Sequence, residues 1–200
     1  CNRIDRNTGG IVIAAKTAEA LRVLNDKIRD REIDKKYLCI VHGRPKPAEG
    51  RLEGYIFKDA KKNQVYVYNT PKLGAKTAVT EYKTLATQGK LSLVQCRLIT
   101  GRTHQIRVHF NWIGHPLFND ERYDGSEIRK GTIYAKYRQF IENCFKLLPR
   151  QALHAKTLGF VHPGTKQMVR FDSPLPADMQ ALIDKWRKYS ENMSQFLEEE

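Results

Sequence analysis

Three short segments gather polar side chains that a plain hydrophobic core would not need. The first, residues 2–10, reads NRIDRNTGG and places Asp5 between Arg3 and Arg6, just before two glycines. Neighbouring positive charges favour the ionised form of a carboxylate, and an ionised carboxylate is available as a nucleophile. The same pattern also suits an aspartate that only caps a turn, and both interpretations stay open at this point.

The second segment, residues 101–115, reads GRTHQIRVHFNWIGH. If it is helical, Thr103 and Arg107 stand four residues apart on one face, with His104 beside both. The apolar residues Ile106, Phe110 and Ile113 then point toward the core. We therefore predict a helix that turns one polar face toward a site.

The third segment, residues 150–165, reads RQALHAKTLGFVHPGT and alternates like a strand. Leu153, Ala155 and Thr157 share one face, opposite His154 and its alternating neighbours. Taken alone, this segment is typical of an ordinary half-buried strand. Only together with the other two segments does it become a candidate part of a functional site.

The chain also carries a large positive charge. Its 200 residues include 35 Lys and Arg against 22 Asp and Glu, a formal net charge of +13, and the surplus lies in the first 150 residues. A broad basic surplus is the electrostatic footprint of a protein that binds a phosphate backbone. Candidates for that contact gather in one stretch: Lys58, Lys61, Lys62, Lys72 and Lys76. No apolar run reaches the roughly 18 residues that span a bilayer, so we expect no membrane partner.

Histidines raise the alternative of a metal site. His104 and His109 are five residues apart, which does not place them on one helical face, and no glutamate accompanies them. The four cysteines are scattered and are typical of reduced core residues in a cytoplasmic protein. The pattern favours histidines that are satisfied in the core or that face RNA. A metal nuclease using His104, His109 and His115 stays an alternative.

The hydrophobic pattern predicts a mixture of strands and helices. Strands are expected at residues 11–15, 37–41, 64–70, 77–84, 91–99, 152–161 and 168–171, with a hairpin turn at residues 88–90. Besides the second segment, helices are expected after an N-cap at Thr17, at residues 132–148 and around residues 179–186. We predict one α+β domain over residues 1–200, with a mixed, mostly antiparallel sheet flanked by helices.

Together, RIDRNTGG, KKYLCIV, GRTHQIRVH and LHAKTLGFVHP resemble, in that order and approximate spacing, the RluA-type family of RNA pseudouridine synthases. The resemblance runs from Asn2 to about Leu182, and GRTHQIRVH is its most specific part. It implies the pseudouridine-synthase catalytic fold. It also implies an isomerase that converts uridines of structured RNA to pseudouridine without a metal or an organic cofactor. The implied partner is ribosomal or transfer RNA, with the target uridine flipped out of a loop.

The resemblance further implies a role for each matching residue. Asp5 is the nucleophile, which attacks either the sugar or the base, and Arg107 pairs with it. Tyr37 stacks on the uracil and is a candidate base for the proton at carbon 5. Leu153 supports the other side of the base, and Arg3 fills the RNA stack after flipping. The residues expected to shape the pocket or touch the RNA backbone are Arg102, Thr103, His104 and Gln105.

The sequence departs from the family pattern around the nucleophile. Asn2 stands where the family usually has histidine, Ile4 where it has leucine, and Gly9 where it has serine. Family members also carry residues before this motif, including an edge strand and sometimes an RNA-binding S4 domain, so we interpret the chain as a catalytic domain that is partial at its N-terminus. An inactive RNA-binding domain of the same fold is the main alternative to an enzyme. A monomer is expected.

Overall fold

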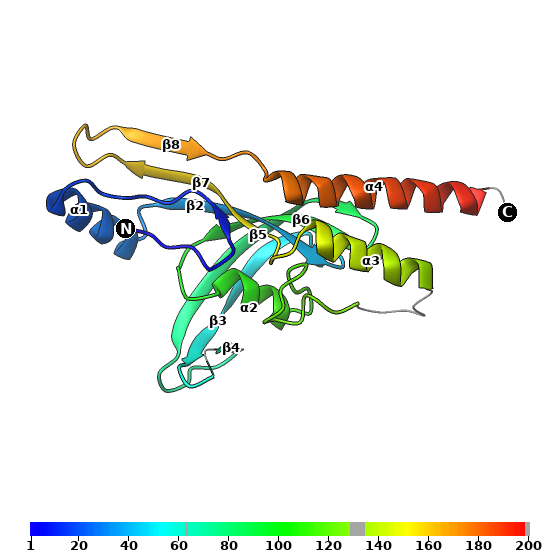
Figure 1. Ribbon diagram of the computed structural model, residues 1–200. Coiled ribbons are helices and arrows are strands. Elements are labelled where there is room, and N and C mark those ends of the chain that lie inside the picture. Colours follow the sequence, from blue (N-terminus) through cyan, green and yellow to red (C-terminus); the bar gives the residue numbers. More distant parts are fainter. Residues whose placement is uncertain (63, 129–134, 199–200) are drawn as a thin grey trace.

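One eight-stranded sheet organises the molecule (Figure 1). The structure is a computed structural model that describes residues 1–62, 64–128 and 135–198. The strands lie in the order β1-β7-β2-β6-β5-β3-β4, and β8 pairs with β7 outside this path. The β1–β7 pair is parallel, and the other pairs between these strands are antiparallel. The bounds are β1 (Gly9–Gly10), β2 (Asp34–His42), β3 (Glu49–Asp59), β4 (Gln64–Tyr68), β5 (Lys76–Gln88), β6 (Leu91–Leu98), β7 (Leu153–Val161) and β8 (Met168–Asp172).

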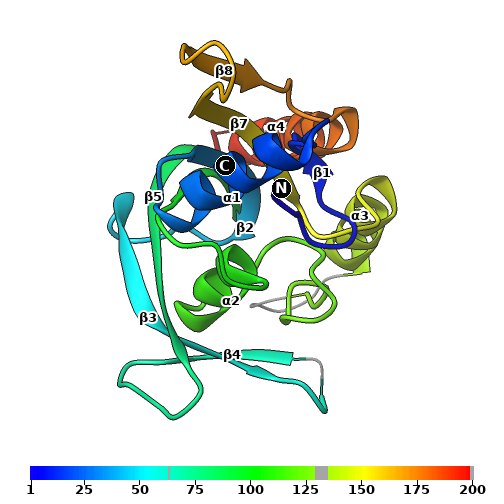
Figure 2. The same ribbon diagram turned by 90° about the vertical axis from the view of Figure 1, so that its left-hand side faces the viewer.

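Helices flank the sheet, and two of them show why they begin where they do. The bounds are α1 (Ala18–Arg29), α2 (Gln105–Trp112), α3 (Ala135–Leu147) and α4 (Ala177–Glu198). Thr17 caps α1, because its hydroxyl accepts a hydrogen bond of 3.1 Å from the amide of Ala20. α2 starts after His104, whose φ of 55° lies in the left-handed region and cannot continue a helix toward the N-terminus. Figure 2 shows α1 and α2 in front of the sheet, close to the N-terminus of the chain.

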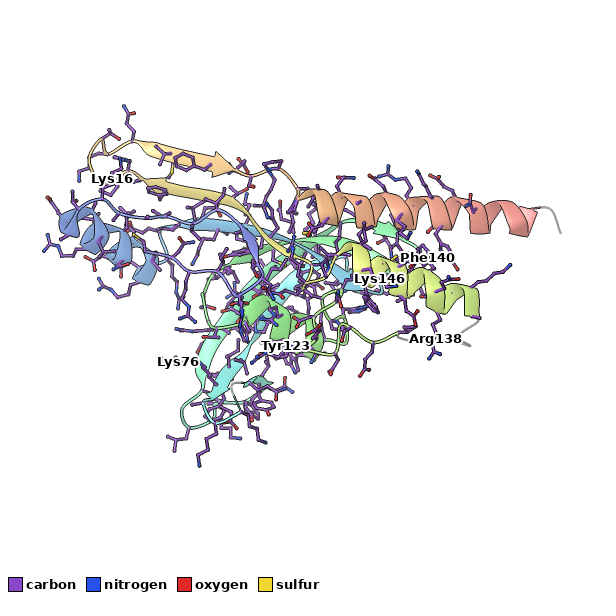
Figure 3. The ribbon with its side chains drawn as sticks, viewed as in Figure 1. Lys16, Lys76, Tyr123, Arg138, Phe140 and Lys146 are labelled. Carbon is purple, nitrogen blue, oxygen red and sulfur yellow. The ribbon has the colours of Figure 1, made fainter. Side chains whose placement is uncertain are left out.

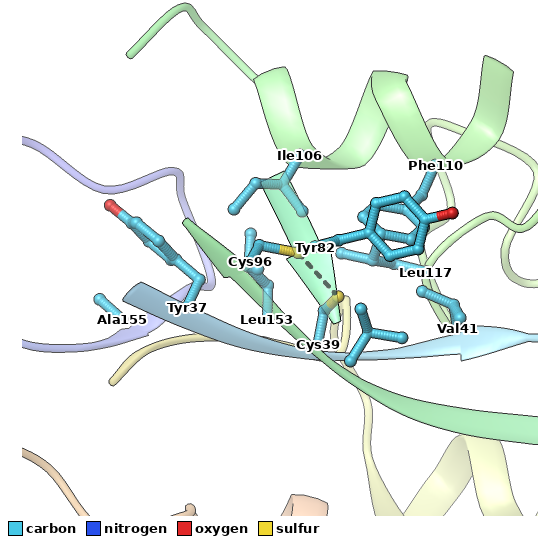
Figure 4. Close-up of a cluster of buried hydrophobic side chains, with 11 residues drawn as sticks. Tyr37, Cys39, Val41, Tyr82, Cys96, Ile106, Phe110, Leu117, Leu153 and Ala155 are labelled. Carbon is cyan, nitrogen blue, oxygen red and sulfur yellow. Dashed lines mark hydrogen bonds between the residues drawn. The ribbon is translucent and has the colours of Figure 1, made fainter. Parts of the chain in front are cut away.

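Alternate residues of β2 divide the core into two layers. Cys39 belongs to a cluster with Ile106 and Phe110 of α2 (Figure 4). The next residue, Ile40, points to the opposite face and packs in a second cluster that includes Trp186 of α4. Because successive side chains of a strand face opposite sides, this strand is buried on both. α2 therefore packs on one face of the sheet, and the site described below lies on that face.

The cysteines match the expectation of reduced core residues. Cys39, Cys96 and Cys144 are buried, Cys1 is half-buried, and all four are free thiols. The sulfur atoms of Cys39 and Cys96 lie 3.8 Å apart in a hydrogen bond between β2 and β6 (Figure 4).

Most of the predicted elements are confirmed, and the α+β class with a mostly antiparallel sheet is correct. The strand predicted at residues 11–15 is wrong. The amide of Ile11 still bonds to the carbonyl of Ala155, at 3.1 Å, but the amide of Ile13 turns to the side-chain oxygen of Asn2, at 2.7 Å. The N-terminal segment therefore takes the place of a sheet neighbour, and the regular pairing of β1 stops at Gly10.

The sequence pattern missed β3 as a distinct strand. Its outward positions carry charged residues (Glu49, Arg51 and Glu53), and two glycines, Gly50 and Gly54, interrupt the apolar alternation. Of the helix predicted at residues 132–148, residues 132–134 lie outside the described part, and α3 occupies the rest. None of the described helices is both long enough and apolar enough to cross a membrane.

Candidate active site

A cavity of about 470 Å³ lies on the α2 face of the sheet, beside the start of α2. Its walls come from the loop before β1, from β2, from the segment between β6 and α2, and from the start of β7. Most of the predicted site residues line it: Arg3, Asp5, Tyr37, Arg102, Thr103, Gln105 and Leu153. Arg107 contacts Asp5, whereas His104 is not part of the lining. The fold thus brings together three segments that are up to 150 residues apart in sequence.

The predicted pairing of Asp5 with Arg107 is present but is the weaker of two contacts. Nη1 of Arg107 lies 3.6 Å from Oδ2 of Asp5. The same guanidinium makes a bidentate contact with Asp120, at 2.6 Å from Nε to Oδ2 and 2.8 Å from Nη2 to Oδ1. The side chain of Asp120 is 1% exposed and that of Arg107 is 7% exposed. Asp120 therefore neutralises and orients Arg107, and Arg107 in turn presents its remaining nitrogen to Asp5.

The charge of Arg107 is well maintained despite its burial. Burial lowers the pKa of the guanidinium, but the hydrogen bond to Asp120 and the negative charges of Asp120 and Asp5 outweigh it, and the pKa is raised overall. Arg107 is therefore a fixed positive charge beside the candidate nucleophile. Sequence reasoning missed Asp120, and no spacing in the segment FNDERYDG marks which of its acidic residues is buried.

His104 and Thr103 differ from the helical arrangement predicted for them. Both precede α2, so they do not stack above Arg107 on a helical face as the sequence pattern suggested. Nδ1 of His104 instead forms a hydrogen bond of 2.7 Å with the hydroxyl of Tyr123. The guanidinium of Arg107 lies over the ring of Tyr123, 5.0 Å from its centre, and Figure 3 shows Tyr123 beside α2. His104 thus supports the arginine through Tyr123.

Gln105 joins the strands to the start of α2. Its amide nitrogen donates to the carbonyl of Val79 and to the hydroxyl of Thr80, both at 2.9 Å. Its amide oxygen accepts from the hydroxyl of Thr100 at 2.7 Å and from the backbone amide of Arg102 at 3.0 Å. These four bonds use the full capacity of a glutamine side chain. Gln105 therefore shapes the cavity wall through hydrogen bonds to the backbone of Val79 and Arg102.

The loop that carries Asp5 is held from β7. The amide nitrogen of Gln151 donates to the carbonyl of Arg6 at 2.6 Å, and the amide of Thr8 donates to the carbonyl of Asp5 at 3.0 Å. Gly10 has a φ of 114°, and a Cβ there would lie 2.2 Å from the carbonyl oxygen of Ala155, so glycine is required. A Cβ at Gly9 would lie 3.5 Å from His154, an ordinary contact, so the glycine there is not forced by space.

Tyr37 and Leu153 are the apolar walls beside Asp5. Tyr37 of β2 lies opposite Ala155 of β7, and Leu153 lies two residues further along the same face of the sheet. Burial raises the pKa of Tyr37 to about 12, and the negative charge of Asp5 adds to this effect. The phenol is therefore protonated and neutral at neutral pH.

This pKa predicts an alkaline loss of stability that depends on Tyr37. Because the folded-state pKa lies above the ordinary value of about 10, the stabilising contribution is complete below pH 10 and is lost as the pH rises toward 12. We expect wild type to lose about 2 kcal/mol more of its unfolding free energy between pH 9 and 12 than Tyr37→Phe loses. Urea unfolding of both proteins across this range measures the difference, and equal slopes would contradict the buried, neutral phenol.

The three histidines of the metal alternative bond to separate partners. His104 contacts Tyr123, Nδ1 of His109 lies 2.9 Å from the hydroxyl of Thr80, and Nδ1 of His115 lies 2.8 Å from the carbonyl of His42. Burial lowers the pKa of His109 to about 4, so this histidine is neutral. Within the described residues, no three His, Cys, Asp or Glu side chains stand close enough to hold a metal ion. The metal-nuclease alternative therefore has no ligand cluster in that part of the chain.

Comparison with known proteins places this site in a family. A family profile described as RNA pseudouridylate synthase matches residues 1–112, which include the Asp5 loop, Tyr37 and the segment of Arg107. The chain belongs to the RNA pseudouridylate synthase family. This membership confirms the family resemblance drawn from the sequence motifs.

Relatives and solved structures agree with this membership in the RNA pseudouridylate synthase family. An uncharacterized RNA pseudouridine synthase of Chlorobaculum parvum is 40% identical over 182 residues, covering 90% of this chain and 55% of the relative. Ribosomal large subunit pseudouridine synthase D of Zymomonas mobilis is 37% identical over 182 residues, covering 91% of this chain and 54% of the relative. The human RNA pseudouridylate synthase domain containing 4 shares the fold, with a TM-score of 0.72 at 22% identity over 94% of this chain and 75% of that chain. The chain thus spans about half the length of the curated relatives it matches.

Proposed function

We propose that this chain isomerises specific uridines of structured RNA to pseudouridine, with the carboxylate of Asp5 as the nucleophile. The observation that carries the proposal is the position of Asp5 in a cavity between Tyr37 and Leu153, with the buried Arg107 beside it. A neutral aromatic wall and an aliphatic wall suit a planar base, and a fixed positive charge orients a carboxylate. Membership in the RNA pseudouridylate synthase family supports the same reaction.

The reaction breaks the bond between N1 of uracil and the sugar, and it forms a bond between carbon 5 and the same sugar carbon. Asp5 attacks the sugar or the base and is released again when the new bond is complete, so nothing is consumed. The proton at carbon 5 must then leave, and N1, which is no longer bonded to the sugar, takes up a proton from water. Because the phenol of Tyr37 is protonated, it can take the proton of carbon 5 only while giving up its own. Among the described residues that line the cavity, Asp5 is the acidic group available to receive that proton.

The cavity also suits the backbone of an RNA substrate. Five cationic residues line it: Arg3, Arg29, Arg31, Lys35 and Arg102. They would hold the phosphates on either side of a uridine flipped into the cavity, while Arg3 fills the vacated place in the RNA stack. Two of the relatives are named for the large ribosomal subunit, which makes ribosomal RNA our first choice of substrate, ahead of transfer RNA. We further propose that residues 1–200 act as one catalytic domain and as a monomer.

Tritium release tests the proposed function. An unmodified large-subunit ribosomal RNA transcript, labelled with tritium at carbon 5 of uridine, is incubated with the chain, and the digested RNA is examined for pseudouridine by mass spectrometry. We expect release of tritium together with an equal amount of pseudouridine at a few positions. RNA binding without any release would favour the inactive RNA-binding domain instead.

Lys35 provides a second test of substrate binding in the cavity. It lies on the same face of β2 as Tyr37, and no carboxylate in the described part of the chain lies within ion-pair distance of its amine. Its pKa is lowered by burial. An unpaired, half-buried ammonium is costly unless a ligand supplies negative charge, and an RNA phosphate does so.

We expect Lys35→Gln to lower kcat/KM by about ten-fold or more, because a hydrogen bond to a charged group contributes about 1.5–3 kcal/mol. The slope of log affinity against log salt should become shallower by nearly one unit, the effect of one lost phosphate contact. The neighbouring Lys36→Gln is the control, because Lys36 faces the other side of β2 and lies 3.7 Å from Asp34. Equal effects of the two substitutions would show that Lys35 makes no specific contact.

A further inference from the structure

A second surface with the chemistry of RNA binding lies on an arm outside the cavity. We define the β3–β4 arm as residues 55–62 and 64–76, which comprise the outer part of β3, β4, the loop to β5 and the first residue of β5. In Figures 1 and 2 this part projects from the body of the molecule, below α2. The arm contains five lysines, Lys58, Lys61, Lys62, Lys72 and Lys76, and Asp59 is its one acidic residue. Figure 3 places Lys76 on the flank of the arm, where β5 begins.

The two faces of this arm differ in what they contact. Ile56 and Val65 turn toward α2 and pack with Val108 and Tyr123 in a buried cluster. The alternating residues therefore point to the opposite face. They are four aromatic residues in two directly opposed cross-strand pairs, Tyr55 with Tyr68 and Phe57 with Tyr66. All four are half-exposed, and none belongs to the hydrophobic clusters of the described residues.

Positive charge already lies on this aromatic face. The amine of Lys72 lies over the ring of Tyr68, 4.3 Å from its centre, and 5.8 Å from the centre of the Phe57 ring. It also donates a hydrogen bond of 3.2 Å to the hydroxyl of Tyr68. The carboxylate of Asp59 accepts hydrogen bonds from the backbone amides of Lys61 and Lys62, which holds it at the turn. The charge around the aromatic residues is thus positive, and it favours an anionic partner.

The arm is connected to the wall of the cavity. Nε of Arg102, a residue of the cavity wall, donates a hydrogen bond of 3.0 Å to the carbonyl of Thr77. Thr77 of β5 lies directly opposite Tyr55 of β3. The wall of the cavity is therefore joined to the base of the arm. The aromatic face lies on the side of the sheet away from α2, and RNA that leaves the cavity reaches it around the edge strand β4.

We propose that the aromatic face of the β3–β4 arm binds unpaired RNA bases by stacking, with Lys72 and the turn residues Lys61 and Lys62 contacting the adjoining phosphates. Half-exposed aromatic rings on a sheet, flanked by lysines, form a platform for single-stranded nucleic acid, because every base has a face that can stack. The choice of RNA as the occupant rests on the proposed function. The surface would hold substrate nucleotides outside the cavity, and it would favour targets with single-stranded RNA beside the modified uridine.

Binding of a uridine-free RNA tests this proposal separately from catalysis. The probe is a fluorescent, single-stranded 12-nucleotide RNA of adenosine and cytidine, and its affinity is measured by fluorescence anisotropy. Tyr55→Leu and Tyr66→Leu keep apolar side chains on the strands and leave the contacts of Lys72 in place. Because one stacked base contributes about 1–3 kcal/mol, we expect each substitution to weaken binding by about ten-fold. A duplex of the same length should bind both variants as it binds wild type.

Phe171→Leu is the matched control, since Phe171 is an exposed aromatic residue on the distant strand β8. We expect its affinity for the probe to equal that of wild type. Thermal unfolding of each variant separates binding from folding, because cross-strand aromatic pairs also stabilise a hairpin. Variants that unfold earlier but bind the probe as tightly as wild type would overturn the proposal. Since the probe contains no uridine, a chain that fails to release tritium can still pass this test, and an active chain can still fail it.

Discussion

Replacing Asp5 by asparagine will reduce tritium release to the background rate while the protein stays folded and binds RNA. The amide has the shape of the carboxylate but cannot act as the nucleophile, so we expect kcat to fall by at least about 10,000-fold. The fold should tolerate the change, because the side chain is 20% exposed and its contact with Arg107 is 3.6 Å long. RNA affinity should stay equal or increase, since a negative charge is removed from a cavity lined by cations.

The control for Asp5→Asn is Asp26→Asn. Asp26 is an exposed residue of α1 that forms an ion pair of 2.9 Å with Arg29, a residue of the cavity wall. This substitution removes the same charge near the same cavity, and we expect its rate to stay within about two-fold of wild type, as for most exposed ion pairs. Full tritium release by Asp5→Asn would remove Asp5 from the chemistry, whatever its position in the cavity.

The family resemblance singled out the side chains that line the cavity around Asp5, and each of them lies in a segment whose secondary structure has a local signal in the sequence. Tyr37 sits in a run typical of a buried strand, and Leu153 sits in an alternating one, so both positions follow once these strands pair. Arg107 lies in a segment with helical periodicity, and the helix exists. The helix begins later than the sequence pattern predicts, because His104 has a left-handed conformation, and its ring forms a hydrogen bond with Tyr123, a residue 19 positions later.

The parts of the site that sequence patterns missed depend on contacts between distant segments. Asp120 lies in a stretch without regular secondary structure, close to Glu121 and Asp124, and its neighbours in sequence do not reveal that it alone faces Arg107. A contact between separate segments also explains why the strand predicted at residues 11–15 does not form. The backbone amide of Ile13 donates to the side chain of Asn2 and is therefore not available to a neighbouring strand. Such long-range hydrogen bonds overrule local propensity, and a single sequence contains no measure of them.

Asp120→Asn will be the most destabilising single substitution at the site. Arg107 then keeps its buried charge, and the 3.6 Å contact to Asp5 is the ion pair that it retains. Breaking a buried ion pair in this way costs about 3–5 kcal/mol of unfolding free energy. We also expect kcat to fall by about ten-fold or more, because a guanidinium freed from Asp120 no longer holds a fixed position beside the nucleophile. Urea unfolding and tritium release measure the two effects on the same preparation.

The pair formed by Arg150 and Asp178 supplies the matched control for this prediction. Its contacts are also bidentate, at 2.8 and 2.9 Å, but the side chain of Asp178 is 29% exposed, against 1% for Asp120. Asp178→Asn should therefore cost only about 1 kcal/mol, as expected of a hydrated pair.

A double variant, Arg107→Met with Asp120→Leu, separates stability from function. Because it removes both buried charges, it should regain much of the stability that Asp120→Asn loses, yet stay inactive. Recovery of activity in the double variant would show that Arg107 contributes to the fold of the cavity and not to the reaction of Asp5. Recovery of stability alone would establish Arg107 as the residue that positions the nucleophile, with Asp120 as the group that makes its burial possible.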